Sequence, residues 1–331
     1  MSTPTSLELP DGVRPTTVRT SRGSFAALQA VPVSGVCERE PALLVPGYTG
    51  SKEDFLAVLG QLADHGRQVV AIDMRGQFET AGTPDPGGYA AAALGADILA
   101  VMRETGARHL VGHSYGGLIG REAALAEGGA GLASLTLMSS GPAALTGPRA
   151  RELSAMLSAI GVPGAGEAPG DAGEFDRGHF DSGQFEGGQF HRAALRVSIA
   201  GIWRDHLEPQ AVAAAVPAPI VAFLGRRMLA NDPVGLVLMA RHMLAAPDRT
   251  AELAQLDLPV LVIYGEDDNA WSPAAQEKMA QRLGARRLCI PAAMHSPAVE
   301  APATTAGALT QFWDAAEARP APHPAAATRT A

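Results

Sequence analysis

Short apolar runs alternate along the chain with stretches whose apolar residues recur every three to four positions. The runs have the length of strands, and the stretches between them have the one-sided pattern of helices packed on a sheet. Strands that are separated by helices pair in parallel, so the alternation predicts an α/β fold with a mostly parallel central sheet and helices on both faces. The predicted strands are residues 42–45, 69–72, 109–111, 135–138, 260–263 and 287–290.

The predicted helices carry their own start and stop signals. Ser51 has the position of an N-cap after the first strand, and Gly66 ends the helical pattern that follows it. Ser272 and Pro273 start another helix, because proline is favoured at the first helical position after a serine cap. A last helix is predicted near residues 304–316.

The alternation of strands and helices is interrupted in the middle of the chain. Between the fourth and fifth predicted strands there are helical patterns but no convincing series of strands, and these patterns cover residues 150–160, 193–205 and 233–245. We therefore predict a discontinuous α/β core, a mostly helical cap inserted into it, and a Pro- and Ala-rich disordered tail. The boundaries are residues 1–141 and 257–318 for the core, 142–256 for the cap and 319–331 for the tail.

A glycine-rich run within the predicted cap, residues 173–190, repeats a five-residue unit that places Phe175, Phe180, Phe185 and Phe190 at equal spacing. A period of five matches neither a helix nor a strand, and three copies are too few for a solenoid. Two interpretations stay open. The run is either a lid loop whose phenylalanines lie over a pocket mouth, or a tandem expansion without a role.

Charge and apolar content exclude several classes of protein. Lys and Arg number 26 against 34 Asp and Glu, a formal net charge of −8, and no basic tract is present. Nucleic acids and anionic membranes are therefore not expected partners. The chain has no apolar leader and no membrane-length apolar run, so a soluble, cytoplasmic protein is expected. Cys37 and Cys289 are too few and too distant to suggest a disulfide scaffold.

The sequence Gly112-His113-Ser114-Tyr115-Gly116 matches the pattern G-x-S-x-G. Five residues alone are weak evidence in a chain with 37 glycines, but here a predicted strand runs directly into the motif and a helical pattern leaves it. A sharp turn from strand to helix would hold the Ser114 hydroxyl exposed at the carboxyl edge of the sheet. The helix N-terminus beside it favours developing negative charge.

A serine nucleophile needs a base, and the base needs a group that orients it. In this topology the acid and then the histidine should each follow a later strand. Asp267 and Asp268 follow the strand at 260–263, and His295 follows the strand at 287–290. The chain order of serine, acid and histidine is therefore the one that this topology requires.

Taken together, the motifs resemble the α/β-hydrolase superfamily over about residues 25–141 and 257–316. The resemblance implies the α/β-hydrolase fold, with the helical insertion in the usual place for a cap. The motifs are Pro46-Gly47-Tyr48-Thr49-Gly50-Ser51, Asp73-Met74-Arg75-Gly76, Gly112-His113-Ser114-Tyr115-Gly116-Gly117, residues 265–268, and His295-Ser296-Pro297 with Glu300.

The resemblance also implies roles for single residues. Ser114 would be the nucleophile and His295 the general base and then acid. Asp268 would orient His295, because the third residue after the glycine carries this role in the family; Asp267 is the rival acid. The backbone N–H groups of Tyr48 and Tyr115 would form the oxyanion hole.

Two departures from the family pattern affect loops near the predicted site. Pro46 stands where a histidine commonly precedes the oxyanion-loop glycine, although the N–H of Tyr48 is retained. The small residues that usually follow Asp73-Met74-Arg75-Gly76 are replaced by Gln77-Phe78-Glu79-Thr80. The substrate contacts that this second loop makes in relatives are therefore not carried over.

Several other polar or aromatic residues have structural interpretations. His113 is expected to be buried and hydrogen-bonded, Arg75 to form a loop-bracing ion pair, and Trp271 to pack beneath the acid loop. The cap histidines match no metal signature, and no glycine-rich phosphate loop with a trailing Lys-Ser/Thr is present. We therefore expect neither a metal nor a cofactor. The cap histidines are His179, His191, His206 and His242.

The sequence thus predicts a serine hydrolase, carboxylesterase-like, that cleaves a small or medium apolar ester, thioester or lactone through an acyl-enzyme. Two alternatives use the same fold. One is a C–C bond hydrolase, an acyl transferase or a cofactor-free lyase or cyclase, and the other is a catalytically silent ligand-binding protein. The partner is a small molecule in each case, and the oligomeric state stays open between monomer and homodimer.

Overall fold

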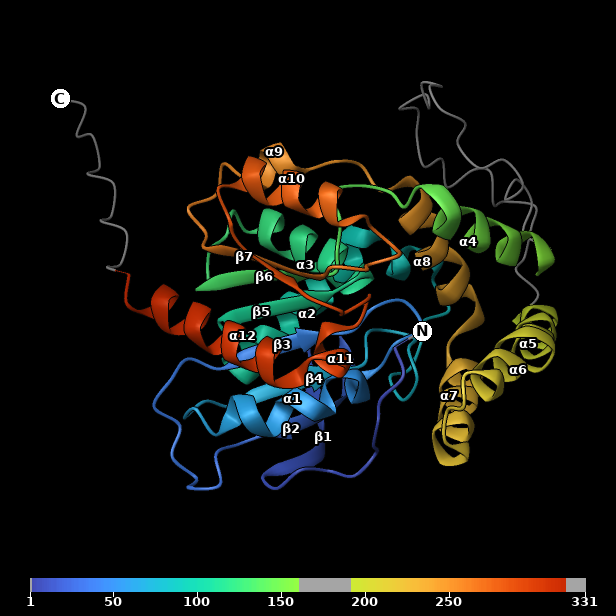
Figure 1. Ribbon diagram of the computed structural model, residues 1–331, viewed down its shortest axis with the longest axis horizontal. Helices are drawn as coiled ribbons and strands as arrows, with labels where there is room; N and C mark the ends of the chain where they lie inside the picture. Colours follow the sequence, from blue (N-terminus) through green and yellow to red (C-terminus); the bar gives the residue numbers. More distant parts are fainter. Residues whose placement is uncertain (1, 161–191, 320–331) are drawn as a thin grey trace.

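The protein is described by a computed structural model that covers residues 2–160 and 192–319. Within these residues its centre is an eight-stranded sheet with the order β1-β2-β4-β3-β5-β6-β7-β8 (Figure 1). Strands β3 to β8 are parallel, β1 and β2 form an antiparallel hairpin, and β2 is antiparallel to β4. The strands are β1 Val13–Thr20, β2 Gly23–Ala30, β3 Ala42–Val45, β4 Val69–Ile72, β5 His109–His113, β6 Ser134–Met138, β7 Val260–Gly265 and β8 Arg286–Ile290.

All six predicted strands are present, each within two residues of its predicted ends, and the mostly parallel α/β fold is confirmed. The hairpin of β1 and β2 was not predicted. Only two of the eight residues of β1 are buried, because this strand lies at the edge of the sheet. It therefore lacks the continuous apolar run that identifies the inner, parallel strands.

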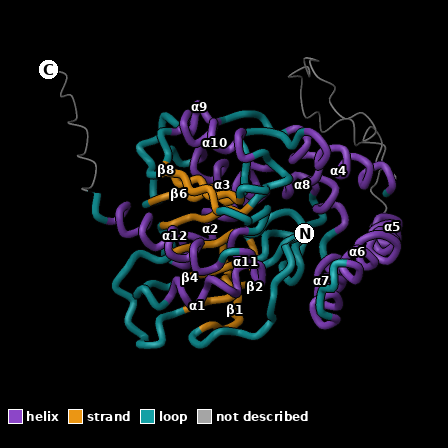
Figure 2. Tube along the Cα trace, viewed as in Figure 1, coloured by secondary structure: helices purple, strands orange, loops and turns teal. Residues whose placement is uncertain are grey.

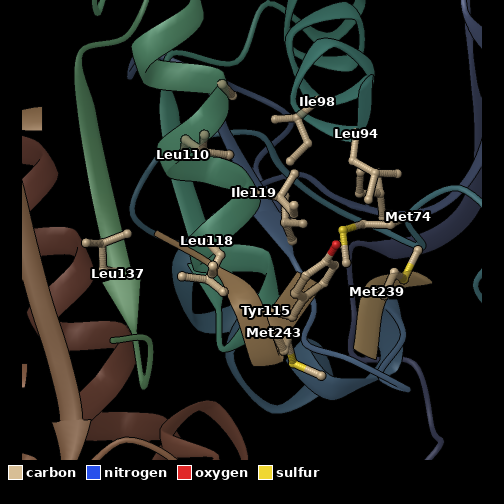
Figure 3. Packing of buried hydrophobic residues seen from close by; sticks show 14 of the residues in the cluster. Met74, Leu94, Ile98, Leu110, Tyr115, Leu118, Ile119, Leu137, Met239 and Met243 are labelled. Carbon is tan, nitrogen blue, oxygen red and sulfur yellow. The ribbon is translucent and has the colours of Figure 1, made fainter. Parts of the chain in front are cut away.

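Helices cover both faces of the sheet (Figure 2). Successive strand residues point to opposite faces, so Leu43 packs into the layer of α2 and α3 while Leu44 packs into the layer of α1 and α12. Figure 3 shows Ile119 of α3 pointing towards Ile98 of α2 within the first layer. The main covering helices are α1 Leu56–Ala63, α2 Ala91–Thr105, α3 Tyr115–Ala126, α10 Pro273–Leu283 and α12 Pro302–Glu317, with the short α11 Pro297–Glu300 before the last.

The described residues between β6 and β7 form helices and no strand. The helices within residues 147–159 and 192–245 lie together at one side of the sheet domain, whereas the short helix at 250–253 lies against α3 and α10 (Figure 1). The division into core and cap stays a prediction. The Phe repeat and the tail from residue 320 lie outside the described residues. No helix in the described part of the chain is long and apolar enough to span a membrane. The helices are α4 Gly147–Ala159, α5 Arg192–Ile202, the π-helical turn η4 Trp203–Leu207, α6 Glu208–Ala213, α7 Ala218–Ala230, α8 Pro233–Ala245 and α9 Thr250–Leu253.

Helix α7 is fixed to the sheet domain by a buried ion pair. Nη1 of Arg227 lies 2.6 Å from Oδ1 of Asp54, which belongs to the 3-10 turn η1 Lys52–Phe55, and their side chains are 0% and 3% exposed. Nη2 of Arg227 donates to the carbonyl oxygen of Ser2 at 2.7 Å. The Ser2 hydroxyl in turn lies 2.9 Å from the hydroxyl of Ser296. One guanidinium thus joins α7, η1 and the N-terminal segment.

Replacing Arg227 with methionine is expected to lower the free energy of unfolding by about 3–5 kcal/mol, because the Asp54 carboxylate would stay buried without its counter-charge. Burial already raises the pKa of Asp54, although Arg227 opposes the shift. Without Arg227 the folded-state pKa rises further above the unfolded one, so stability falls as the pH rises between the two values. Denaturant unfolding should therefore show a smaller deficit at about pH 5 than at about pH 8.

Arg226 provides the matched control. It is the preceding residue of the same helix and is exposed. Arg226→Met is therefore expected to change the free energy of unfolding by no more than about 0.5 kcal/mol. If Arg226→Met and Arg227→Met lower the free energy of unfolding by the same amount, the Arg227–Asp54 pair does not anchor α7.

Candidate active site

Ser114 lies at a sharp turn between β5 and α3. Its φ of 54° and ψ of −119° are angles that L-residues rarely adopt. Its N–H donates to the carbonyl of Met138 at 2.8 Å, which ties the turn to the neighbouring strand β6. The turn places the hydroxyl at the carboxyl edge of the sheet and at the N-terminus of α3, where partial positive charge favours an anion.

The glycines around Ser114 are required by close approaches of the backbone. A Cβ on Gly112 would lie 2.3 Å from the carbonyl oxygen of Gly116. A Cβ on Gly116 would lie 2.5 Å from the carbonyl oxygen of Pro46, in the loop after β3. A side chain at Gly112 would force the turn itself open, and one at Gly116 would push the turn away from the loop after β3, so the spacing of the motif has a direct steric cause.

The structure brings Ser114, His295 and Asp268 into one hydrogen-bonded chain. Nε2 of His295 lies 3.0 Å from Oγ of Ser114, and Nδ1 lies 2.9 Å from Oδ1 of Asp268. Asp268 follows β7 and His295 follows β8, so three loops at the same sheet edge supply the three groups. A carboxylate can only accept, so Nδ1–H donates to Asp268 and Nε2 is left to accept the serine proton. Asp267 is exposed, and its side chain makes no hydrogen bond to His295.

Asp268 accepts two further hydrogen bonds. The N–H of Ala270 donates to Oδ1 at 2.9 Å, and Nε2 of Gln276 donates to Oδ2 at 2.8 Å. Burial raises the pKa of Asp268, but the hydrogen bonds from His295, Ala270 and Gln276 outweigh it and hold the pKa below its ordinary value. The side chain is therefore an anion near neutral pH. Sequence reasoning missed Gln276, whose position on α10 belongs to no recognised motif.

The loop that carries His295 is held from both sides. The carboxylate of Glu300 accepts the N–H groups of Met294 at 2.6 Å and Ser296 at 3.2 Å. Nε2–H of His113 donates to the carbonyl oxygen of His295 at 2.7 Å. Burial lowers the pKa of His113 to about 3, with a smaller contribution from His295. His113 therefore stays neutral and braces the loop without adding charge beside His295.

The two predicted oxyanion donors flank the serine. A Cβ on Gly47, the residue before Tyr48, would lie 3.0 Å from Cβ and 3.4 Å from Oγ of Ser114, so the loop after β3 passes directly over the hydroxyl. Tyr115 is the first residue of α3. Among the residues described, the N–H groups of Tyr48 and Tyr115 donate to no protein acceptor. Backbone N–H groups without a protein partner are available to a ligand.

Arg75 and Trp271, for which the sequence predicted structural roles, make structural contacts near the site. Nε and Nη2 of Arg75 bind both carboxylate oxygens of Asp97 at 2.6 and 2.8 Å, which braces the loop after β4 against α2. Trp271 is buried and donates Nε1–H to the carbonyl of Ala143 at 2.9 Å. Its ring centroid lies 6.4 Å from that of His295, next to the acid loop.

The described cap histidines are dispersed. His206 is exposed on η4, whereas Nδ1 of His242 lies 3.3 Å from the Tyr115 hydroxyl, and burial lowers the pKa of His242 to about 4. His179 and His191 lie outside the described residues. Within residues 2–160 and 192–319, no three His, Cys, Asp or Glu side chains are grouped so as to hold a metal ion.

Residues 42–308 match the model of the alpha/beta hydrolase family, so the chain belongs to this family and the resemblance is confirmed. Over 108 residues it is 38% identical to a protein named as a carbamate hydrolase, RutD, of Variovorax paradoxus strain S110. That match spans 32% of this chain and 40% of the relative. The chain therefore aligns with less than half of this curated relative's length.

Solved structures share the fold at low sequence identity. A hydrolase from Pseudomonas aeruginosa PA01 is 22% identical, with a TM-score of 0.63 over 90% of this chain and 98% of that one. A thermophilic esterase from Thermogutta terrifontis is 20% identical, with a TM-score of 0.64 over 92% and 99%. An enol-lactonase from Burkholderia xenovorans LB400 is 18% identical, with a TM-score of 0.62 over 90% and 100%. At these identities the likeness concerns the fold.

Proposed function

We propose that the protein is a serine hydrolase of the carboxylesterase type, which cleaves a small or medium apolar ester, thioester or lactone through an acyl-enzyme. The observation that carries the proposal is the unbroken hydrogen-bonded chain from Asp268 through His295 to Ser114, next to two unpartnered backbone N–H groups. Each group required for acyl transfer has a candidate: the nucleophile, base and orienting acid lie at hydrogen-bonding distance from one another, and the two candidate oxyanion donors lie in the residue after Ser114 and in the loop that passes over its hydroxyl.

In the proposed reaction, Oγ of Ser114 attacks the carbonyl carbon while its proton passes to Nε2 of His295. The oxyanion that forms accepts hydrogen bonds from the N–H groups of Tyr48 and Tyr115. His295 then donates its proton to the leaving group, and the acyl group stays on Ser114. Water, deprotonated by His295, releases the acid and restores the serine. Asp268 remains ionised throughout and stabilises the imidazolium.

The apolar packing around the residue after Ser114 supports a mainly apolar substrate. Helix α8 brings Met239 and Met243 towards Tyr115, the residue after the nucleophile (Figure 3). Flexible thioether side chains adapt to apolar groups of different shapes. The name of the Variovorax relative adds carbamates to the bonds worth testing, since their cleavage proceeds through the same type of tetrahedral intermediate. The predicted cap would set this specificity, and the cytoplasmic location stays a prediction.

A panel of substrates and a covalent probe test the proposal. Short and medium nitrophenyl esters, aryl thioesters, lactones and aryl carbamates are offered to the protein, and product release is measured. A fluorophosphonate should label one residue, and peptide mapping should place the label on Ser114. Turnover of an ester, thioester or lactone together with this label is the expected result.

Two other outcomes correspond to the alternative functions. Turnover of diketones, or transfer of the acyl group to an added alcohol or amine in preference to water, would replace ester hydrolysis with C–C cleavage or acyl transfer. Ligand-induced thermal stabilisation with neither turnover nor labelling would instead indicate a ligand-binding protein that retains the arrangement without its chemistry.

A further inference from the structure

The amide of Gln77 connects two loops that lie far apart in the sequence. Gln77 follows β4 and its side chain is fully buried, with 1% of the residue exposed. Nε2 donates to the carbonyl oxygen of Gly47 at 2.9 Å, and Oε1 accepts the N–H of Met74 at 3.1 Å. The first bond crosses from the loop after β4 to the loop after β3. The bond from Met74 fixes the orientation of the amide. The amide oxygen must face the Met74 N–H, so the NH2 group faces the Gly47 oxygen, to which it alone can donate.

The carbonyl of Gly47 and the N–H of Tyr48 belong to one peptide group. The described residues contain no cis peptide bond, so this group is planar and trans, and its C=O and N–H point in opposite directions. A donor that holds the Gly47 oxygen therefore also sets the direction of the Tyr48 N–H. A hydrogen bond to the oxygen polarises the peptide as well, which strengthens the N–H as a donor.

We infer that Gln77 is a positioning residue that aims the Tyr48 N–H at the oxyanion formed on Ser114. This inference rests on the proposed function, because the oxyanion is a species of that reaction. Within the loop itself, the Gly50 N–H also donates to the Gly47 oxygen at 3.0 Å, but that bond moves with the loop. Gln77 ties the same oxygen to a separate, buried part of the core.

The residue after Gln77 shows that this loop is held in place by its neighbours. Phe78 has a φ of 38°, in the left-handed region that costs a non-glycine residue about 1 kcal/mol or more. Its ring packs edge-on against Phe223 of α7, with centroids 5.6 Å apart, and lies 4.7 Å from Nζ of Lys52. These contacts hold the strained turn, which in turn presents the Gln77 amide to Gly47.

Gln77→Met tests the role, because methionine has a similar length and volume but cannot donate. We expect kcat for the best ester of the panel to fall about 10- to 100-fold, a part of the loss seen when an entire oxyanion donor is removed. KM should change by less than about threefold, since the donor acts mainly on the transition state. Binding of a trifluoromethyl ketone, which forms an oxyanion on the serine, should weaken in parallel with kcat/KM.

Thr80→Val is the matched control for general damage to the loop. The Thr80 hydroxyl is buried and bonds the N–H of Ala26 and the carbonyl of Asp73, both at 2.9 Å, without touching Gly47. It should lower the melting temperature but leave kcat within about twofold of the wild type. Equal losses of kcat in Thr80→Val and Gln77→Met would overturn the inference, and so would an unchanged kcat in Gln77→Met.

Gln77→Glu keeps the test decisive if the methionine variant does not fold. Because burial favours a protonated carboxyl, which could still donate to Gly47, kcat of this variant is measured at alkaline pH. There the ionised glutamate accepts the Met74 N–H but has no proton for Gly47, so kcat should fall at least as much as in Gln77→Met. Retention of wild-type kcat in a folded Gln77→Glu protein would overturn the inference. Absence of any Ser114-dependent turnover in the wild type would instead overturn the proposed function, and with it the inference.

Discussion

Replacing Ser114 with alanine is expected to reduce turnover of a short-chain nitrophenyl ester by about 10⁴-fold or more, to the level of any binding and oxyanion contribution that remains. In the proposed reaction the serine oxygen is the atom that attacks, and no other hydroxyl lies on the His295–Asp268 chain in the described residues. Steady-state rates of purified wild type and variant measure the effect. Fluorophosphonate labelling of the variant should disappear as well.

The same variant should fold normally. Alanine and serine meet the same backbone strain at a φ of 54°, and within the described residues the hydroxyl bonds only to His295, so the melting temperature should change little. A folded Ser114→Ala protein with wild-type turnover would contradict the proposed function. A silent ligand-binding protein would not need the Ser114 hydroxyl. If a ligand stabilises the wild type and Ser114→Ala equally, and neither protein turns over the ester, the ligand-binding alternative is favoured.

Asp268→Asn is expected to lower kcat by about 10³- to 10⁴-fold with a smaller effect on KM. All three partners of the carboxylate are donors: His295 Nδ1–H, the Ala270 N–H and Gln276 Nε2. An asparagine has one oxygen, so its NH2 group must face one of these donors. It also carries no charge to stabilise the imidazolium of His295. Steady-state kinetics over a range of ester concentrations separate kcat from KM.

Asp267→Asn is the control for this substitution. The side chain of Asp267 is exposed and next in sequence, so the change in charge is identical while the contact with His295 is untouched. Its kcat should stay within about twofold of the wild type. The reverse pattern, with activity lost in Asp267→Asn and kept in Asp268→Asn, would transfer the role to the rival acid.

Features that depend on local sequence patterns could be predicted from the amino-acid sequence alone. The inner strands are continuous apolar runs, and the elbow at Ser114 requires glycines at fixed positions because the backbone of the Pro46 loop approaches within 2.5 Å of where a Cβ would be. The order of serine, acid and histidine follows from the topology of a parallel sheet. These features predicted both the fold and the three side chains that the structure brings together.

Features that depend on long-range approach could not be predicted. Gln77 and Gly47 are 30 residues apart, and nothing in either segment signals that a side-chain amide would meet a backbone carbonyl. The bond from Gln276 to Asp268 depends likewise on how α10 packs against the acid loop. The departure at Gln77 was visible in the sequence, but its meaning required the neighbouring loop in place.

The hairpin that places β1 at one edge of the sheet also bears on how copies of the protein behave towards one another. An open edge can recruit a strand from a second chain, which is a route to aggregation. Here β1 carries Pro15, which has no N–H to donate, between the charges of Arg14 and Arg19. The opposite edge, β8, begins with two adjacent arginines. Both edge strands of the described sheet therefore carry residues that disfavour pairing with a strand from another chain.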